Sequence, residues 1–168
     1  EDVELSGWIE TLMAYSGETT NKLFAASSIG TIFDMSGGDT NLITEGGDSI
    51  LTDPDGDLLL ISSSTSATSI TGLSNGRFQY INFANSGGNY IILCNGVDTV
   101  RAYNGTVWSE PSISGVTSSD LIHINLHKRR IWFTEDGTLS AWYLDTDAIQ
   151  GTAHEFDLKS FASKGGYL

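Results

Sequence analysis

The stretch that decides the fold is NYIILCNGVDTVRAYNGTVW, residues 89–108, in which two Asn-Gly pairs separate short apolar runs. The run YIILC (90–94) has no polar alternation, which is typical of a strand covered on both faces. The run VRAY (100–103) alternates apolar and polar side chains, which predicts a strand with one wetter face. Each Asn-Gly pair favours a tight turn, because Asn and Gly tolerate positive φ. The stretch therefore predicts antiparallel strands whose broad sides need neighbouring sheets.

Similar strand–turn–strand segments recur along the chain, and each one pivots on a glycine. The pivots are Gly30, Gly96 and Gly137, which lie 66 and 41 residues apart. The shorter spacing falls within the period of about 40–50 residues that four-stranded propeller blades show. We therefore predict an all-β fold built from antiparallel, blade-like repeats of a β-propeller. Because three units do not easily close a ring, the chain is either part of a larger propeller or an open, sandwich-like stack.

The repeats set the predicted domain organisation, a single β-rich domain over residues 1–168. Its blade-like units, with their approximate bounds, are 8–38, 75–114 and 120–144. We expect residues 39–74 to form an insertion or an extra hairpin, and residues 145–168 to lead into the next unit.

Two segments also carry helical signals. Residues 8–15, WIETLMAY, fit both a helical and an alternating period, and we favour a strand because Ser6-Gly7 would interrupt the helix. In FDLKSFASKGG, residues 156–166, we expect a short helical turn that Asp157 caps at its start and Gly165 at its end.

Charge excludes several classes of partner. The formal net charge is −13, and residues 1–60 carry 12 carboxylates against the single base Lys22. Such a surface repels phosphates, so we expect no direct binding of nucleic acid. The one basic cluster, Lys128-Arg129-Arg130, is predicted to be a solvated strand end, with contact to a partner's acidic face as the alternative. No apolar run approaches the roughly 20 residues of a membrane span, and the acidic N-terminus lacks the positive n-region of a signal peptide.

Few residues point to metal or cofactor chemistry. Asp53, Asp55 and Asp57 alternate along DPDGD, where carboxylate oxygens suit Ca²⁺, but the positions that complete an EF-hand loop hold Leu58 and Ser64. We favour an ordinary Pro-Asp-Gly turn there and expect no cofactor. His123 and His127 share one face of a predicted strand without a third ligand nearby, and Cys94, the single cysteine, is predicted to be a buried core residue.

The aromatic residues leave two interpretations open. Trp8, Trp108, Trp132 and Trp142 either fill space between sheets, which we favour, or form a platform on which sugar rings stack. A propeller hydrolase is a third hypothesis, with carboxylates taken from the predicted turns at Asp98, Glu135 and Asp136. No G-x-S-x-G elbow, P-loop or H-E-x-x-H motif is present, so we expect the protein not to be an enzyme.

Most of the chain, roughly residues 8–38 and 75–168, resembles a family of structural virion proteins of bacteriophages and prophages. Its members belong to the head–tail or tail region and are similar in style to propeller-bearing proteins that plug or extend the portal and stabilise packaged DNA. The resemblance rests on NKLFAASSIGTIFDMSGG (21–38), NGRFQYINFANSGGNYIILCNGVDTVRAYNGTVW (75–108) and HINLHKRRIWFTEDGTLSAWYLDTDAIQGTAHEFDLKSFASKGGYL (123–168). Residues 39–70 take no part in it.

The resemblance implies a non-catalytic head–tail connector or tail component. Such a protein is made in the cytoplasm of the bacterial host and ends in the virion. Its partners would be other copies of itself in a ring and neighbouring virion proteins, and Lys128 and Arg129 are candidate contacts. The alternative is a carbohydrate- or receptor-binding propeller module of a phage tail or secreted protein, with a glycan held by Trp108, Trp132 or Trp142.

Overall fold

The computed structural model describes residues 7–36 and 67–160, which form an all-β structure of antiparallel sheets with no α-helix in those ranges. The first sheet contains β1 (Ile9–Ser16), β2 (Asn21–Ser27), β3 (Thr31–Asp34) and β4 (Ala67–Ile70). The second contains β5 (Gln79–Asn85), β6 (Gly88–Cys94), β7 (Arg101–Tyr103) and β8 (Trp108–Ser109). The third contains β10 (Leu121–His127), β11 (Arg130–Glu135), β12 (Ser140–Tyr143) and β14 (His154–Asp157).

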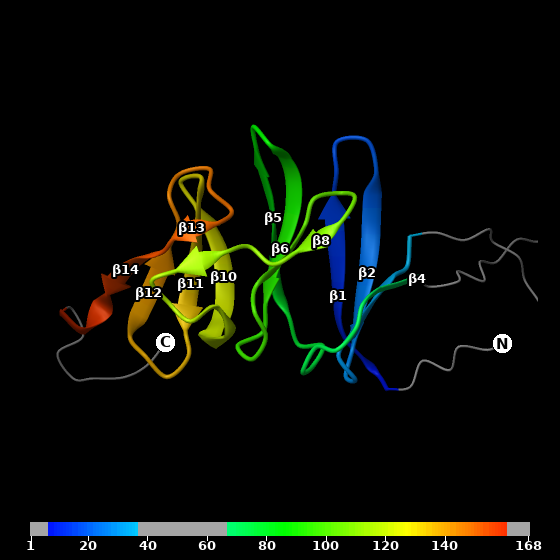
Figure 1. Cartoon of the computed structure of the whole chain (residues 1–168), viewed down its shortest axis with the longest axis horizontal. Helices are drawn as coiled ribbons and strands as arrows, with labels where there is room; N and C mark the ends of the chain where they lie inside the picture. Colours follow the sequence, from blue (N-terminus) through cyan, green and yellow to red (C-terminus); the bar gives the residue numbers. More distant parts are fainter. Residues whose placement is uncertain (1–6, 37–66, 161–168) are drawn as a thin grey trace, which may run out of the picture.

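In each sheet the strands lie side by side in the order in which the chain supplies them. The three sheets stand in a row, with the first and third at opposite ends (Figure 1). Short strands β9 (Ile113–Ser114) and β13 (Gly151–Thr152) form a parallel pair, and the 3-10 turns are η1 (Ser118–Asp120) and η2 (Leu158–Ser160). The described part of the chain is therefore an open row of sheets, not a closed propeller.

Two of the sheets take their fourth strand from outside the predicted units. Strand β4 lies in the range expected to be an insertion or extra hairpin, and it pairs with β3. Strand β14 lies in the range expected to lead onward, and it pairs with β12. Residues 9–16 form a strand, as predicted, and the turn η2 follows Asp157, whose Oδ1 accepts a hydrogen bond from the Lys159 amide at 2.8 Å.

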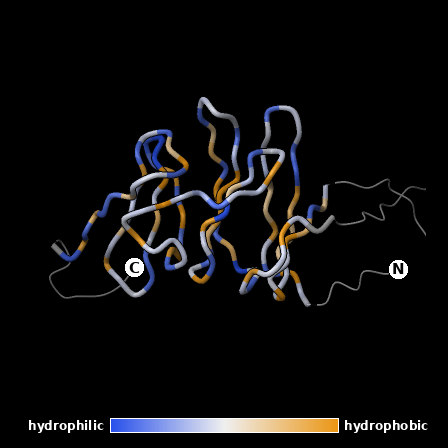
Figure 2. The backbone as a smooth tube through the Cα atoms, viewed as in Figure 1, coloured by the Kyte–Doolittle hydropathy of each residue, from blue (hydrophilic) through white to orange (hydrophobic). Residues whose placement is uncertain are grey.

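Two apolar layers fill the spaces between the sheets, and β6 contributes to both. Ile91 and Leu93 belong to the layer shared with the first sheet, and Ile92 and Cys94 belong to the layer shared with the third. All four are at most 1% exposed, and Tyr90 is partly buried. The prediction that YIILC is covered on both faces is therefore confirmed. Figure 2 shows hydrophobic stretches along strands of all three sheets, including those at the ends of the row.

The pivot glycines occupy the same place in each sheet, the turn between the second and third strands. Gly30, Gly96 and Gly137 have φ values of 73°, 75° and 65°, in the left-handed region that glycine adopts at little cost. The chain therefore places a glycine with positive φ between the second and third strands of each sheet.

Polar contacts fix the second sheet against the first. The hydroxyl of Thr11 donates to the Gly76 carbonyl at 2.6 Å and accepts from the Phe78 amide at 3.0 Å. Farther along β1, the Asn82 side chain donates to the Ala14 carbonyl at 2.8 Å and accepts from the Ser16 amide at 3.0 Å. These bonds join the first strands of consecutive sheets and set how one sheet stacks on the next.

Candidate functional site

The candidate site lies on the outer face of the third sheet, the face turned away from the second sheet. Ile131 and Phe133 point into the inter-sheet layer, so Trp132 between them points outward, because successive side chains of a strand alternate in direction. Trp132 is directly opposite Tyr143 on β12, and Tyr143 is opposite His154 on β14. Cross-strand register thus builds a row of rings on this face.

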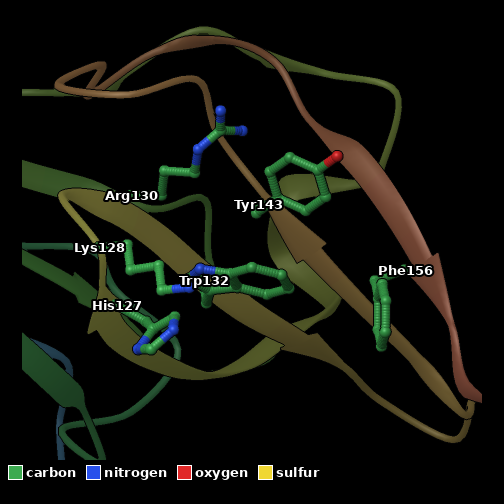
Figure 3. A pocket seen from close by; sticks show the side chains of 6 residues that line it. All are labelled: His127, Lys128, Arg130, Trp132, Tyr143 and Phe156. Atoms are coloured by element: carbon green, nitrogen blue, oxygen red, sulfur yellow. The ribbon is translucent and has the colours of Figure 1, made fainter.

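The rings enclose a shallow hollow of about 410 Å³ (Figure 3). The centroids of Trp132 and Tyr143 are 4.7 Å apart with planes tilted by 34°, and Phe156 meets Trp132 edge-on at 6.1 Å. On the far side of Tyr143, the His154 ring lies 5.3 Å away. Phe156 is 43% exposed, so the aromatic wall faces solvent.

Cationic side chains line the same hollow. The Arg130 guanidinium lies 5.2 Å from the centre of the Tyr143 ring, a cation–π distance, and Lys128 and His127 complete the lining. Among residues 7–36 and 67–160, no carboxylate forms an ion pair with Lys128 or Arg130. The hollow therefore combines an apolar wall with positive charge that nothing in the described structure neutralises.

One hydrogen-bond donor of this hollow lacks an acceptor. The indole Nε1 of Trp132 is buried without a hydrogen-bond partner in the described structure. Figure 3 shows the Lys128 side chain extending toward the same indole. A buried donor left unsatisfied costs about 1–3 kcal/mol. An acceptor such as a carboxylate, placed beside Lys128 and Trp132, would relieve that cost.

The turn that carries the cations has an unusual backbone. Lys128 and Arg129 are the two residues between β10 and β11, with φ of 50° and 60°, and Asp147 has φ of 62°. No other non-glycine residue of the described ranges has positive φ. Two-residue turns with positive φ favour Asn-Gly. The turn lies at the strand end that the sequence predicts here, but Lys-Arg carries none of the usual signals for its positive-φ conformation.

Arg129 forms an ion pair, whereas Lys128 and Arg130 form none within the described residues. Its guanidinium donates twice to the Asp147 carboxylate, from Nε at 2.8 Å and from Nη2 at 2.7 Å, and its carbonyl accepts from the Asp147 amide at 2.8 Å. The Asp147 carbonyl accepts in turn from the Asn85 side chain at 2.7 Å. Arg129 therefore anchors the turn to the second sheet, which leaves Lys128 and Arg130 beside the hollow.

The other two candidate tryptophans lie elsewhere. The Trp108 ring packs 5.1 Å from Phe24 and from Tyr103, beside the layer between the first and second sheets. Trp142 packs against the other layer and donates from Nε1 to the Glu135 carboxylate at 2.9 Å. Both fill space between sheets, as favoured, whereas Trp8, just before β1, is 69% exposed. The four tryptophans do not form one sugar-stacking platform, and only Trp132 lines the hollow.

The candidate carboxylates have local bonding partners. Asp98 accepts from the Ser74 amide at 2.9 Å and from its hydroxyl at 2.8 Å. Burial opposes ionisation of Asp98, but hydrogen bonds from Asn95 and Ser74 outweigh it and lower the pKa of the carboxyl. Asp136 lies in the turn after β11, where its amide donates to the Asp120 carbonyl at 2.8 Å. The Asp98 carboxylate therefore holds the segment at Ser74, whereas the Asp136 bond is made by its backbone alone.

The weak candidates for metal ligands do not form a site in the described residues. No group of three His, Cys, Asp or Glu side chains within those ranges could hold a metal ion, and this includes His123 and His127. Asp53, Asp55 and Asp57 lie outside the residues that the structure describes.

Cys94 provides a first test of the packing. Burial raises the pKa of its thiol to about 12, and the side chain is 1% exposed in the layer between the second and third sheets. At neutral pH the thiol is therefore protonated and covered, and we expect the folded protein not to react with Ellman's reagent. One equivalent should react in guanidinium chloride, which serves as the control. Rapid labelling under native conditions would show that the second and third sheets separate readily.

The structure defines a class of protein, an all-β stack of antiparallel sheets that ends in an aromatic and cationic face. Comparisons of the chain with protein-family models, with curated proteins and with solved structures find no match. In the described ranges, no helix has the length and apolar character needed to cross a membrane.

Proposed function

We propose that this protein is a non-catalytic structural component of a bacteriophage virion, a head–tail joining or tail protein that acts through protein–protein assembly. The observation that carries the proposal is that the row of sheets has an apolar outer face at each end. At one end are the rings of Trp132, Tyr143 and Phe156. At the other are Leu12 and Leu23, which are 60% and 43% exposed.

The apolar face of the first sheet follows from strand alternation. Met13 and Phe24 are paired across β1 and β2 and point into the layer shared with the second sheet. Leu12 and Leu23 precede them and therefore point the opposite way. On the same face Ala25 and Phe33 are buried, so Leu12 and Leu23 are its exposed apolar side chains. Exposed apolar side chains gathered on one face mark sites where other proteins bind. A sheet with apolar side chains on both faces is suited to the interior of a stack.

The finer fold assignment, blade-like units of a propeller-type protein, is part of the same proposal. Three observations support it: the sequential strand order of each sheet, the common place of the pivot glycines, and a register irregularity near the start of the first strand. That irregularity falls between Ile9 and Thr11 in the first sheet and between Leu121 and His123 in the third. The resemblance to phage virion proteins supports the setting in which such units assemble.

The direct test is the presence of the protein in particles. We expect mass spectrometry of purified virions, from the phage or induced prophage whose genome encodes the chain, to detect it at several copies per particle. Antibody labelling should place it at the head–tail junction or on the tail. Its absence from purified particles would contradict the proposed function.

A carbohydrate- or receptor-binding module is the second candidate, favoured by the open hollow at Trp132 with its aromatic rings and the unpaired indole N–H of Trp132. Under this alternative, a glycan array gives reproducible binding that Trp132→Ala abolishes and that Trp108→Phe, a change outside the hollow, leaves intact. Binding that survives Trp132→Ala would rule this site out.

A further inference from the structure

We infer that the outer face of the third sheet binds an acidic segment of another virion protein, with a carboxylate of that partner held by Lys128, Arg130 and the Trp132 indole. The inference rests on the proposed assembly function and names the chemistry of one partner. The occupant of the hollow is then a different protein, not a sugar and not a second copy of this chain.

The strands of the third sheet place no carboxylate on the outer face. Their three carboxylates, Glu135, Glu155 and Asp157, pair in register with residues whose side chains lie on the inner face. Just after β12, the Asp145 carboxylate lies 3.3 Å from Nε2 of His154. In a chain with 21 carboxylates, a strand-built face without one suits a negatively charged partner.

The hydrogen-bond donors of the hollow gather on one side of it. Lys128 is exposed and Arg130 is partly buried, and neither forms an ion pair within the described residues. Figure 3 shows both cations on the side where the indole nitrogen of Trp132 lies, whereas Phe156 stands at the other side. A carboxylate accepts up to about four hydrogen bonds, so one such group can serve all three donors.

The opposite side of the hollow provides an apolar contact. Phe156 is 43% exposed and meets the Trp132 ring edge-on at 6.1 Å. Trp, Tyr and Arg are the residue types that contribute most to binding at protein interfaces, and this hollow has one of each in Trp132, Tyr143 and Arg130. The partner segment therefore carries an apolar side chain beside its carboxylate.

The stacking of the rings disfavours a sugar as the occupant. Tyr143 lies between Trp132 and His154, whose rings are 4.7 Å and 5.3 Å away and tilted from it by 34° and 31°. Its two faces are therefore already in contact with other rings, which leaves little of Tyr143 for a sugar ring. A neutral sugar also brings no charge to Lys128 and Arg130.

The carboxylates of this chain disfavour a second copy. Most of those in the described ranges already accept hydrogen bonds or ion pairs within their own chain, among them Glu10, Asp34, Asp98 and Glu110. Using one of them in the hollow of another copy would break such a bond. Two copies also share a net charge of −13, which opposes their close approach.

The test detects the contact at Lys128 inside the particle. A water-soluble carbodiimide joins a lysine amine to a touching carboxylate through an amide bond, with no spacer between them. We expect mass spectrometry of cross-linked, purified virions to find Lys128 joined to an Asp or Glu of another virion protein. The Lys22–Asp34 ion pair should give a link within the chain, which serves as the positive control.

Each outcome bears on a different claim. Particles that contain the chain and the Lys22–Asp34 link, but leave Lys128 unlinked, overturn the inference and leave the proposed function standing. A sugar in the hollow would give this same result. A link from Lys128 to a second copy of this chain overturns the choice of partner. Absence of the chain from particles overturns the proposed function, and the inference with it.

Competition for places in the particle measures what the hollow contributes. Variant and wild-type chains are expressed in equal amounts in a host that makes the phage without its own copy of the gene, and their ratio in particles is measured. We expect Arg130→Glu to be at least about tenfold under-represented, because it puts a carboxylate where the partner's carboxylate binds. Lys159→Glu, an equal charge reversal at an exposed residue outside the hollow, is the matched control and should enter as the wild type does.

A second variant tests the unpaired indole N–H. Trp132→Phe deletes the donor but keeps an aromatic ring, so we expect it to be about tenfold under-represented, from the loss of one hydrogen bond to a charged group. Thermal melts and circular dichroism spectra that match the wild type exclude misfolding as the cause. If Arg130→Glu and Trp132→Phe enter particles as readily as the wild type, the hollow takes no part in binding and the inference is overturned.

Discussion

Alanine at Gly30 is expected to destabilise the protein far more than alanine at Gly137, although both glycines have left-handed backbones in equivalent turns. A Cβ atom on Gly30 would overlap the Leu73 carbonyl oxygen and lie 2.5 Å from the Leu73 carbonyl carbon. Gly30 also accepts a hydrogen bond from the Leu73 amide at 3.0 Å, so this backbone contact cannot widen without losing it. A Cβ on Gly137 would meet no atom within 4 Å.

The two substitutions therefore separate conformational strain from steric overlap. Gly137→Ala should lower the free energy of unfolding by about 1–2 kcal/mol, because alanine is strained in a left-handed backbone. Gly30→Ala should lower the free energy of unfolding by at least about 3 kcal/mol more. The added Cβ atom would force the backbone at Leu73, just before the second sheet, to move. Urea denaturation of both variants beside the wild type measures the difference. Equal losses would mean that the segment around Leu73 shifts freely, and that the close contact is not needed to hold the first two sheets together.

The sequence predicted the inner strands well because their side chains carry the pattern. YIILC could be assigned to a strand covered on both faces, since a run without polar alternation has no face to leave in water. Trp8 to Tyr15 could be assigned to a strand once Gly7 argued against a helix. In both cases the burial of side chains decides the structure. The hydropathy pattern of a sequence shows which side chains are buried.

The edge strands could not be assigned to their sheets for the opposite reason. Strand β4 is the segment ATSI of a Ser/Thr-rich run, and β14 is the segment HEFD. Strand β4 joins the first sheet by backbone hydrogen bonds to β3, and β14 joins the third sheet by backbone hydrogen bonds to β12. Such bonds form with almost any side chains. An outermost strand needs only a free neighbouring edge, which is a property of the assembled sheet.

The candidate site was visible only in part. Trp132, Lys128 and Arg129 could be selected as candidate contacts, yet nothing in the sequence distinguished Trp132 from Trp108 and Trp142. Cross-strand register decides which tryptophan faces outward, and it brings Tyr143 to within 4.7 Å of Trp132. Register depends on how whole strands pair, so the spacing of residues along the chain does not reveal it.

The central strand should be where truncation of a core side chain has a large effect on stability. Ile91 and Ile92 are adjacent on β6, both 0% exposed, and they belong to different apolar layers. Each change to alanine should cost about 2–5 kcal/mol, from the lost burial and the cavity that remains. Val97→Ala, at a position that is 52% exposed, is the matched control and should change stability by less than about 0.5 kcal/mol.

The double variant tests whether the row of sheets folds as one unit. Because the two side chains point to opposite faces, their losses should nearly add, to about 4–10 kcal/mol, which approaches or exceeds the whole stability of many domains. We therefore expect Ile91→Ala/Ile92→Ala to be largely unfolded at 25 °C by circular dichroism. Each single variant should melt in one transition, since β6 contributes to both layers and neither can be lost without it. Two transitions in Ile91→Ala, with Cys94 still protected from thiol reagents after the first, would instead mean that the second and third sheets form a separate folding unit.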